Sequence, residues 1–324
     1  NVLLAAMVAG LPPPIVLNDG HSHPLIGFGT YKVGVVPASA SSALAAGAVE
    51  AQADAVNPAE CVAAALGLGY RFIDCAEFYA NEKAVGEGIA RSGVPRDEIF
   101  LASKVWTSTI AKGPEAVQAQ LERTLADLGT NYLDLYCIHW PVPTKHVAAY
   151  LQLEKAQAAG QVRSIGVSNY CKEDYLELMA GGAQISPAVN QIEVNPFLFR
   201  KETLAFFASV GCTVQSYRAL RDGKAFQDST LVDVAQRLGR TPAQVLGRWC
   251  VHHRIVPIVK SVHPERMAEN LAIFDFEIPP DQMDRLDALT TPDAIAKYVE
   301  LYRKCVTRDT DLPAALARTA ITEA

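Results

Sequence analysis

Four polar side chains of complementary chemistry end or follow three successive apolar runs of the sequence. Asp74 lies in RFIDC (71–75), Lys104 in IFLASKV (99–105) and His139 ends LDLYCIH (133–139). Tyr79 follows Asp74 by five residues. An ammonium group stabilises a nearby phenolate and lowers the pKa of the tyrosine, which can then donate a proton near neutral pH. The four residues therefore predict a general-acid site that protonates an oxygen while a hydride reaches the neighbouring carbon.

Each of these groups also has a structural interpretation. Asp74 and Lys104 can form a buried salt bridge with no catalytic role, because a buried charge needs a partner. Tyr79 alone can be an aromatic residue at the rim of a pocket. The joint occurrence of all four on neighbouring strand ends favours the catalytic interpretation. Asp74 would then hold Lys104 in place, and His139 would orient a carbonyl oxygen by a hydrogen bond.

The elements that must position these residues recur along the chain. Eight short apolar runs alternate with longer amphipathic stretches, at 25–29, 71–75, 99–105, 133–139, 162–168, 188–194, 212–217 and 254–260. Such alternation predicts a parallel α/β fold, and eight units in 324 residues match a (β/α)8 TIM barrel. In that fold the chemistry lies at the carboxyl ends of the strands, where the four residues occur.

Helix ends and turns support this fold. Gly129, Gly160 and Gly239 follow helical patterns as C-caps, and Thr241-Pro242 has the pattern of a helix start. Asn18-Asp19-Gly20 predicts a β-hairpin before the barrel. We expect one domain over 1–324.

Three segments lie outside the repeated units. Residues 1–14 are expected to form an apolar N-terminal extension that packs on the body. The Ala/Ser-rich insertion at 35–57 is expected to be flexible or weakly helical at the surface, and 292–324 to form a C-terminal loop segment.

Composition excludes several functional classes. The net charge is -6, so nothing favours binding of nucleic acid, and no stretch of 18 apolar residues suggests a membrane span. The seven cysteines contain no CxxC pair, which favours a reduced, cytoplasmic location over a disulfide framework. His21 with His23, and His252 with His253, lack acidic or cysteine partners at metal-ligand spacing, so no metal is expected. Gly86-Glu87-Gly88 lacks a third glycine and fits a helix–helix contact better than a dinucleotide loop.

Several motifs in order resemble the aldo-keto reductase superfamily from about residue 15 to 290. They are GYRFIDCAEFYANE (69–82), SKVW (103–106), DLYCIHWP (134–141), GVSNY (166–170), NQIEVNP (190–196) and KSVHPERMAEN (260–270). The resemblance implies an NADPH-dependent reductase that converts an aldehyde or ketone to an alcohol. It also implies that Asp74, Tyr79, Lys104 and His139 form the catalytic tetrad, with Tyr79 as the proton donor.

The same resemblance implies the cofactor contacts. Ser168, Asn169 and Gln191 match residues that hold the nicotinamide carboxamide, and Tyr217 matches the aromatic residue that stacks on its ring. The matches for the adenosine end are Lys260, Ser261 and Arg266 at the 2'-phosphate, and Glu269 and Asn270 at the adenine. The remaining expected cofactor contacts are Gly29, Thr30, Tyr31, Asp74, Arg218 and Leu220. The expected substrate contacts are Tyr31, Tyr79, Trp106, His139 and Trp140, although core packing explains the two tryptophans almost equally well.

This chain departs from the family pattern at a few positions. Cys75 stands where threonine is usual, Tyr170 where phenylalanine is usual, and Val259 where proline is usual. Arg218-Ala219-Leu220 replaces a common Ser-Pro-Leu, whose serine contacts a cofactor phosphate. Arg218 can replace that contact by a charge-assisted hydrogen bond.

Two alternative functions stay open. One is a non-catalytic cofactor-binding member of the same fold, because a fold does not prove an activity. The other is a different barrel enzyme with a lysine base, which leaves the motif at 260–270 unexplained. For the reductase we expect a small carbonyl substrate and a monomer or weak oligomer. Tyr298, Leu301 and Tyr302 suggest an apolar or aromatic pocket wall.

Overall fold

Eight parallel strands close into a barrel, as predicted. The computed structural model describes residues 12–37, 49–52 and 56–317. The barrel order is β10-β11-β12-β3-β6-β7-β8-β9, and each predicted apolar run contains one of the strands. They are β3 (Gly27–Gly29), β6 (Phe72–Asp74), β7 (Phe100–Val105), β8 (Leu133–Ile138), β9 (Val162–Ser168), β10 (Val189–Glu193), β11 (Thr213–Tyr217) and β12 (Val256–Val259).

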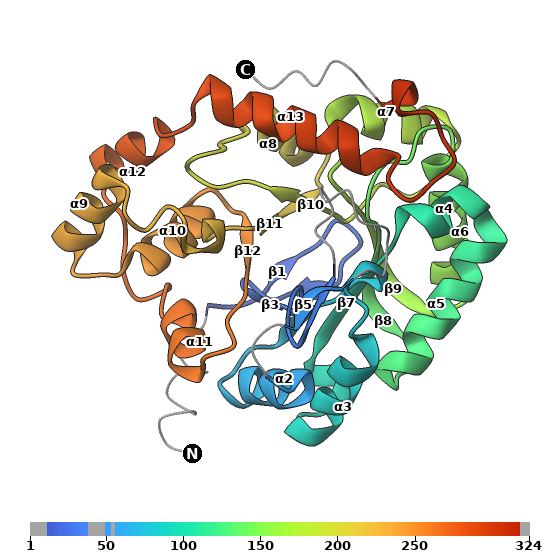
Figure 1. Cartoon of the computed structure of the whole chain (residues 1–324), viewed down its shortest axis with the longest axis horizontal. Helices are drawn as coiled ribbons and strands as arrows, with labels where there is room; N and C mark the ends of the chain where they lie inside the picture. Colours follow the sequence, from blue (N-terminus) through green and yellow to red (C-terminus); the bar gives the residue numbers. More distant parts are fainter. Residues whose placement is uncertain (1–11, 38–48, 53–55, 318–324) are drawn as a thin grey trace.

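Helices surround the strands (Figure 1). They are α2 (Pro58–Gly67), α3 (Glu82–Ser92), α4 (Thr107–Lys112), α5 (Pro114–Leu128), α6 (His146–Ala158), α7 (Lys172–Ala180), α8 (Lys201–Ser209), α9 (Ser229–Leu238), α10 (Pro242–His252), α11 (Pro264–Leu271), α12 (Pro280–Asp287) and α13 (Pro292–Val306). Short 3₁₀ turns are η1 (Glu77–Tyr79), η2 (Arg96–Glu98), η3 (Arg221–Gly223) and η4 (Ala314–Leu316). Within the described ranges, no helix is both long and apolar enough to cross a membrane.

The predicted helix ends are confirmed. Gly129 and Gly239 end their helices with left-handed backbone, which glycine adopts without steric cost. Gly160, with φ of +75°, lies one residue beyond the C-cap of α6. The side chain of Thr241 accepts a hydrogen bond from the backbone N–H of Gln244, and the side chain of Gln244 accepts one from the backbone N–H of Thr241, so α10 begins with a complete capping box.

The predicted N-terminal hairpin is also confirmed. β1 (Ile15–Val16) pairs antiparallel with β2 (Ser22–His23), and Gly20 takes a φ of +88° in the turn. Leu17 packs in one apolar cluster with the first residues of several barrel strands, among them Phe72, Phe100 and Val256. The hairpin therefore covers the amino end of the barrel and leaves the carboxyl end of the strands open for chemistry.

The expectation for residues 35–57 was wrong in part. β4 (Val35–Pro37) and β5 (Val49–Gln52) form an antiparallel pair with Val36 opposite Ala51. β-Branched valines on both arms favour strands, whereas the alanine-rich composition between them suggested a flexible or helical segment. Residues 38–48 and 53–55 lie outside the described part of the chain.

The C-terminal segment is not simply a loop, because its first half is the helix α13. Thr291 caps the helix by accepting a hydrogen bond from Ala294, and Pro292 occupies its first turn. One face buries Tyr298, Tyr302 and Cys305. The other carries the i,i+4 ion pairs Asp293–Lys297 and Glu300–Lys304. Residues 318–324 and most of the predicted N-terminal extension, residues 1–11, lie outside the described ranges.

The Gly86-Glu87-Gly88 motif makes helix–helix contacts, as predicted. A Cβ atom on Gly86 would lie 2.7 Å from the carbonyl oxygen of Asp127 in α5. A Cβ atom on Gly88 would lie 2.6 Å from the carbonyl oxygen of Ala59 in α2. Both glycines thus let backbones approach closely around α3.

Gly86→Ala should lower the free energy of unfolding by about 1–3 kcal/mol, because the new methyl group meets backbone atoms that cannot move aside. Gly67→Ala is the matched control, since nothing lies within 4 Å of its added Cβ and alanine is the better helix former. Urea unfolding of the two variants tests this. A Gly86→Ala variant as stable as Gly67→Ala would contradict the packing argument.

Candidate active site

The ammonium group of Lys104 is the centre of a buried polar cluster. Its Nζ donates hydrogen bonds to Asp74 Oδ1 (2.7 Å), to the carbonyl oxygen of Cys75 (2.8 Å) and to Tyr79 Oη (3.2 Å). Asp74 pairs with Ala102 between β6 and β7, so Lys104, two residues further along, leaves the same face of its strand. Only 1% of the Lys104 side chain is exposed. The predicted pairing of Asp74 with Lys104 is confirmed.

These contacts determine the charge states of the cluster. Burial alone would lower the pKa of Lys104, but the charge of Asp74, its hydrogen bond and the contact with Tyr79 more than offset this effect, so the pKa is raised and the ammonium stays charged. Burial also raises the pKa of Tyr79, and Lys104 reverses only part of that effect. The expected net fall in the pKa of Tyr79 was therefore wrong, because the loss of hydration on burial outweighs the effect of the ammonium. Tyr79 is a protonated phenol at neutral pH, the form that can donate a proton.

His139 lies directly after β8 and is neutral. Burial lowers the pKa of His139 well below its ordinary value, and the charge of Lys104 lowers it further. Its ring lies edge-on to Trp106, with centroids 4.9 Å apart, and 6.0 Å from the ring of Tyr79. A neutral imidazole has one N–H to donate and one nitrogen that accepts. His139 therefore offers a hydrogen bond without placing a second positive charge beside Lys104.

Aromatic side chains cover the cluster. Trp106 and Trp140 line the cavity and are also 2% and 3% exposed, so they serve as pocket wall and core at once. Asp309, beyond α13, accepts a hydrogen bond from Trp106 Nε1 (2.9 Å). The ring of Tyr302 lies behind that of Trp140, at 5.9 Å, and its hydroxyl donates to Asp174 (2.9 Å). Of the three C-terminal residues predicted to line the pocket, Leu301 does so, whereas Tyr298 and Tyr302 are buried beside it.

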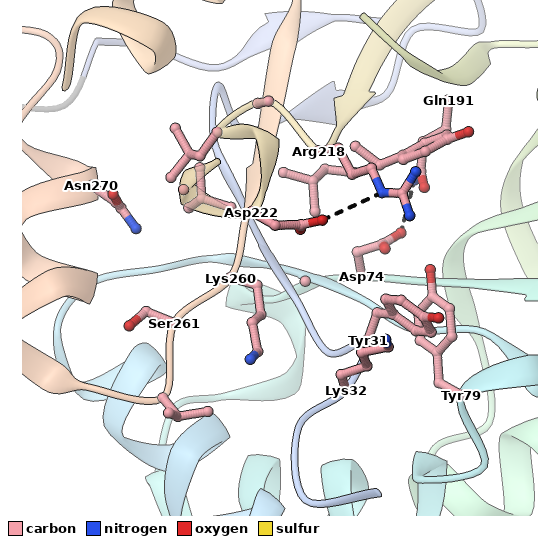
Figure 2. Close-up of a pocket in the computed structure, with 18 of the residues that line it drawn as sticks. Tyr31, Lys32, Asp74, Tyr79, Gln191, Arg218, Asp222, Lys260, Ser261 and Asn270 are labelled. Atoms are coloured by element: carbon pink, nitrogen blue, oxygen red, sulfur yellow. Dashed lines mark hydrogen bonds and ion pairs between the residues drawn. The ribbon is translucent and has the colours of Figure 1, made fainter. Parts of the chain in front are cut away.

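The cavity above the cluster has a volume of about 990 Å³ and continues far beyond Tyr79. In Figure 2, Asp74, Tyr79 and Gln191 lie on one side of the view, and Lys260, Ser261 and Asn270 lie on the other. All predicted substrate contacts line it, as do most of the predicted cofactor contacts, namely Gly29, Tyr31, Asp74, Asn169, Gln191, Tyr217, Arg218, Leu220, Lys260, Ser261, Arg266, Glu269 and Asn270.

Three predicted residues lie behind the cavity wall. The hydroxyl of Thr30 donates to the carbonyl oxygen of Asp74 (2.9 Å), and that of Ser168 donates to the carbonyl oxygen of Gln191 (2.8 Å). Lys104 lies behind Tyr79. Thr30 and Ser168 therefore hold the backbone of site residues, and their side chains do not line the cavity.

Asn169 connects the ends of several strands at the cavity wall. Its Nδ2 donates to the carbonyl oxygen of His139 (3.0 Å), and its Oδ1 accepts from the hydroxyl of Tyr217 (2.7 Å). Its backbone is left-handed, with φ of +61°, a conformation that asparagine tolerates better than most residues. This arrangement fixes the ring of Tyr217 at the carboxyl end of the barrel, where Tyr217 lines the cavity.

The far end of the cavity carries positive charge. Lys260 and Ser261 follow β12, and Arg266 lies in the first turn of α11. Glu269, a possible partner for Arg266, instead accepts a hydrogen bond from Thr241 (2.5 Å). In the described part of the chain, no ion pair joins Arg266 to Glu269 or Glu265. The arrangement can therefore bind an anionic group.

The loop after β11 contributes the largest single group of lining residues that the sequence did not predict. Arg218 Nη1 lies 3.2 Å from Glu193 Oε2, and its Nε lies 3.7 Å from Asp222 Oδ2. The second of these ion pairs is drawn in Figure 2. The missed residues of this loop are Ala219, Asp222, Gly223, Lys224 and Phe226, and those elsewhere include Lys32, Phe78 and His263. The loops after the strands form the site of a (β/α)8 barrel, so the residues of this loop could have been predicted by extending the expected site past Leu220.

Comparison with known proteins agrees with this site. The profile of the Aldo/keto reductase family matches residues 25–291. The chain belongs to this family. An aldo-keto reductase of Mycolicibacterium smegmatis is 38% identical over 87% of this chain and 94% of its own length.

Two further relatives carry more specific names. The glyoxal reductase of Bacillus subtilis is 36% identical over 89% of this chain and 97% of its own length. The crystal structure of a Bombyx mori aldo-keto reductase in complex with NADP has a TM-score of 0.75 and 29% identity, over 86% of this chain and 93% of that one. As an aldo-keto reductase, this protein is a member of an oxidoreductase family with a (β/α)8 barrel.

Proposed function

We propose that this aldo-keto reductase uses NADPH to reduce an aldehyde or ketone to an alcohol, with Tyr79 as the proton donor. The observation that carries the proposal is the buried ammonium of Lys104, which contacts both Asp74 and the hydroxyl of Tyr79 at the base of the cavity. The NADP complex of the Bombyx mori relative and the glyoxal reductase of Bacillus subtilis support the cofactor and the substrate class.

The residues around the cavity fit a dinucleotide. A volume of about 990 Å³ is at the upper end of the range for ligand sites and leaves room for a small substrate. Gln191, Asn169 and the ring of Tyr217 would hold the nicotinamide, next to Tyr79. Lys260, Ser261 and Arg266 would hold the ribose 2'-phosphate at the other end, where the N-terminus of α11 adds backbone donors. When bound, the cofactor supplies the hydride.

The protein's own side chains would then handle the oxygen of the substrate. The hydroxyl of Tyr79 gives its proton to the carbonyl oxygen as the carbonyl carbon gains a hydride, so the C=O group becomes CH–OH. The phenolate left on Tyr79 is stabilised by the ammonium of Lys104, 3.2 Å away. Neutral His139 orients the oxygen by a hydrogen bond. Phe78, Trp106 and the other aromatic wall residues exclude water, which strengthens these interactions.

Tyr79→Phe should reduce the turnover of carbonyl reduction by about two to four orders of magnitude, because the general acid is lost. NADPH binding, followed by fluorescence titration, should barely change. Tyr150→Phe is a control for losing a buried phenol, since the hydroxyl of Tyr150 donates to the carbonyl oxygen of Ile185 away from the cavity. A Tyr79→Phe enzyme that turns over like Tyr150→Phe would exclude Tyr79 as the proton donor.

Arg266→Ala should weaken NADPH binding by about 1.5–3 kcal/mol, the range for hydrogen bonds to charged groups. NADH binding should hardly change, because NADH lacks the 2'-phosphate. The loss should shrink as salt is added, since part of the attraction is screened. Arg240→Ala is the control, because Arg240 pairs with Asp275 and does not line the cavity. Equal losses for the two cofactors in Arg266→Ala would be incompatible with a phosphate contact.

A further inference from the structure

A row of buried polar side chains leads from the catalytic carboxylate to the N-terminal hairpin. Gln191 Nε2 donates to Asp74 Oδ1 (2.9 Å) and also to Gln215 Oε1 (2.8 Å). Gln215 Nε2 in turn lies 2.8 Å from Nε2 of His23 in β2. Gln215 and His23 are 0% exposed, and neither lines the cavity. The proposed mechanism uses neither of them.

Strand register and packing hold this row in place. Gln191 is the direct partner of Gln215 between β10 and β11, so both side chains leave the same face of the sheet. The ring of His23 lies edge-on to Phe72, at 4.9 Å between centroids, and 4.3 Å from Phe100. His23 is thus an imidazole enclosed by rings, with hydrogen-bond partners at both nitrogens.

The proton on His23 can be located from its partners. Nδ1 lies 2.6 Å from the carbonyl oxygen of Pro24, which can only accept, so Nδ1 carries a hydrogen. Burial lowers the pKa of His23 to about 4, so the ring is neutral near pH 7 and Nε2 has no hydrogen. Nε2 must therefore accept, and the amide nitrogen of Gln215 must face it.

This direction passes along the row. With its amide nitrogen toward His23, Gln215 presents its amide oxygen to Gln191, and the amide nitrogen of Gln191 donates a hydrogen bond to that oxygen. Both amide hydrogens of Gln191 are then used, by Gln215 and Asp74, and only its oxygen remains for a ligand. We propose that His23 is a positioning residue that, through Gln215, fixes which end of the Gln191 amide faces Asp74 and which end faces the ligand.

The opposite arrangement shows why the direction matters. If Nε2 of His23 carried a hydrogen, Gln215 would turn its oxygen toward the ring and its nitrogen toward Gln191. Gln191 would then turn as well and set its oxygen against Asp74 Oδ1. Two acceptors would face each other in a buried site, at a cost typical of unsatisfied polar groups. The carboxylate that holds Lys104 would lose a donor.

The proposal rests on the proposed function in one respect, the identity of the ligand group. The oxygen of Gln191 would accept a hydrogen bond from the carboxamide NH₂ of the nicotinamide. The 3-acetylpyridine analogue of NADP⁺ replaces that NH₂ by a methyl group, so a fixed Gln191 oxygen should discriminate against it. If the Gln191 amide is free to turn, the affinities for NADP⁺ and for the analogue should differ less.

The first experiment is independent of the function. In ¹⁵N-histidine NMR spectra of the full chain at pH 7, the signals of His23 are those that disappear in His23→Met. We expect the neutral Nδ1–H tautomer. The Nε2–H tautomer, or a ring protonated at both nitrogens, would overturn the proposal.

The second experiment compares the dissociation constants of NADP⁺ and its 3-acetylpyridine analogue. We expect wild type to favour NADP⁺ by about three- to tenfold, the value of one neutral hydrogen bond, and His23→Met to bring the ratio close to one. His21→Met is the matched control on the same hairpin and should keep the wild-type ratio, since His21 contacts Asp19 and Ser164 outside the row. A wild-type ratio in His23→Met would overturn the proposal. No discrimination by wild type would overturn the carboxamide contact, leaving the NMR result to decide the role of His23.

A second pair of variants keeps the test decisive if His23→Met does not fold. Gln215→Met removes both the amide oxygen and the amide nitrogen, so this variant should no longer bind NADP⁺ more tightly than the 3-acetylpyridine analogue. Gln215→Glu presents an oxygen to Gln191 and another to His23, so it should retain discrimination while the NMR spectrum shows His23 protonated at both nitrogens. Retained discrimination in Gln215→Met, or its loss in Gln215→Glu, would contradict the proposal.

Discussion

The buried ammonium of Lys104 is the interaction on which the site depends. A lone charge at 1% exposure would cost several kcal/mol, so its neighbours must supply compensating contacts. Asp74, the carbonyl oxygen of Cys75 and the hydroxyl of Tyr79 together use all three of its N–H groups. They come from β6 and the turn after it, so the parallel pairing of β6 with β7 brings them to Lys104.

This arrangement places a protonated phenol beside a permanent positive charge. Burial favours the neutral forms of Tyr79 and His139, whereas the charge of Lys104 favours the phenolate that proton donation would create. The cluster can therefore stabilise negative charge on the tyrosine oxygen as it develops, without reorganising. Gln191 supports the cluster by a hydrogen bond to Asp74, and Trp106 and Trp140 line the cavity beside it.

Most of the barrel could be predicted from the sequence, because each strand is a short apolar run and helix ends such as Thr241-Pro242 have local signals. Asp74 with Lys104 could be predicted as well, since adjacent strand ends meet at one rim. The pairing of β4 with β5 was not predicted, because the segment is rich in alanine. Helix α13 was not predicted either, because the C-terminal segment was expected to be a loop. The pKa of Tyr79 could not be predicted, because burial is a property of the folded chain. The contact of Gln215 with His23 depends on register and packing between residues 192 positions apart.

Lys104 should act on the reaction through Tyr79, and a double-mutant cycle on turnover tests this most directly. Wild type, Lys104→Met, Tyr79→Phe and the double variant are compared at saturating NADPH with one aldehyde. Lys104→Met should slow the wild-type enzyme, yet cause little further loss once Tyr79 is phenylalanine, because the group it stabilises is gone. Losses that multiply in the double variant would show that Lys104 and Tyr79 act independently, which would contradict the account.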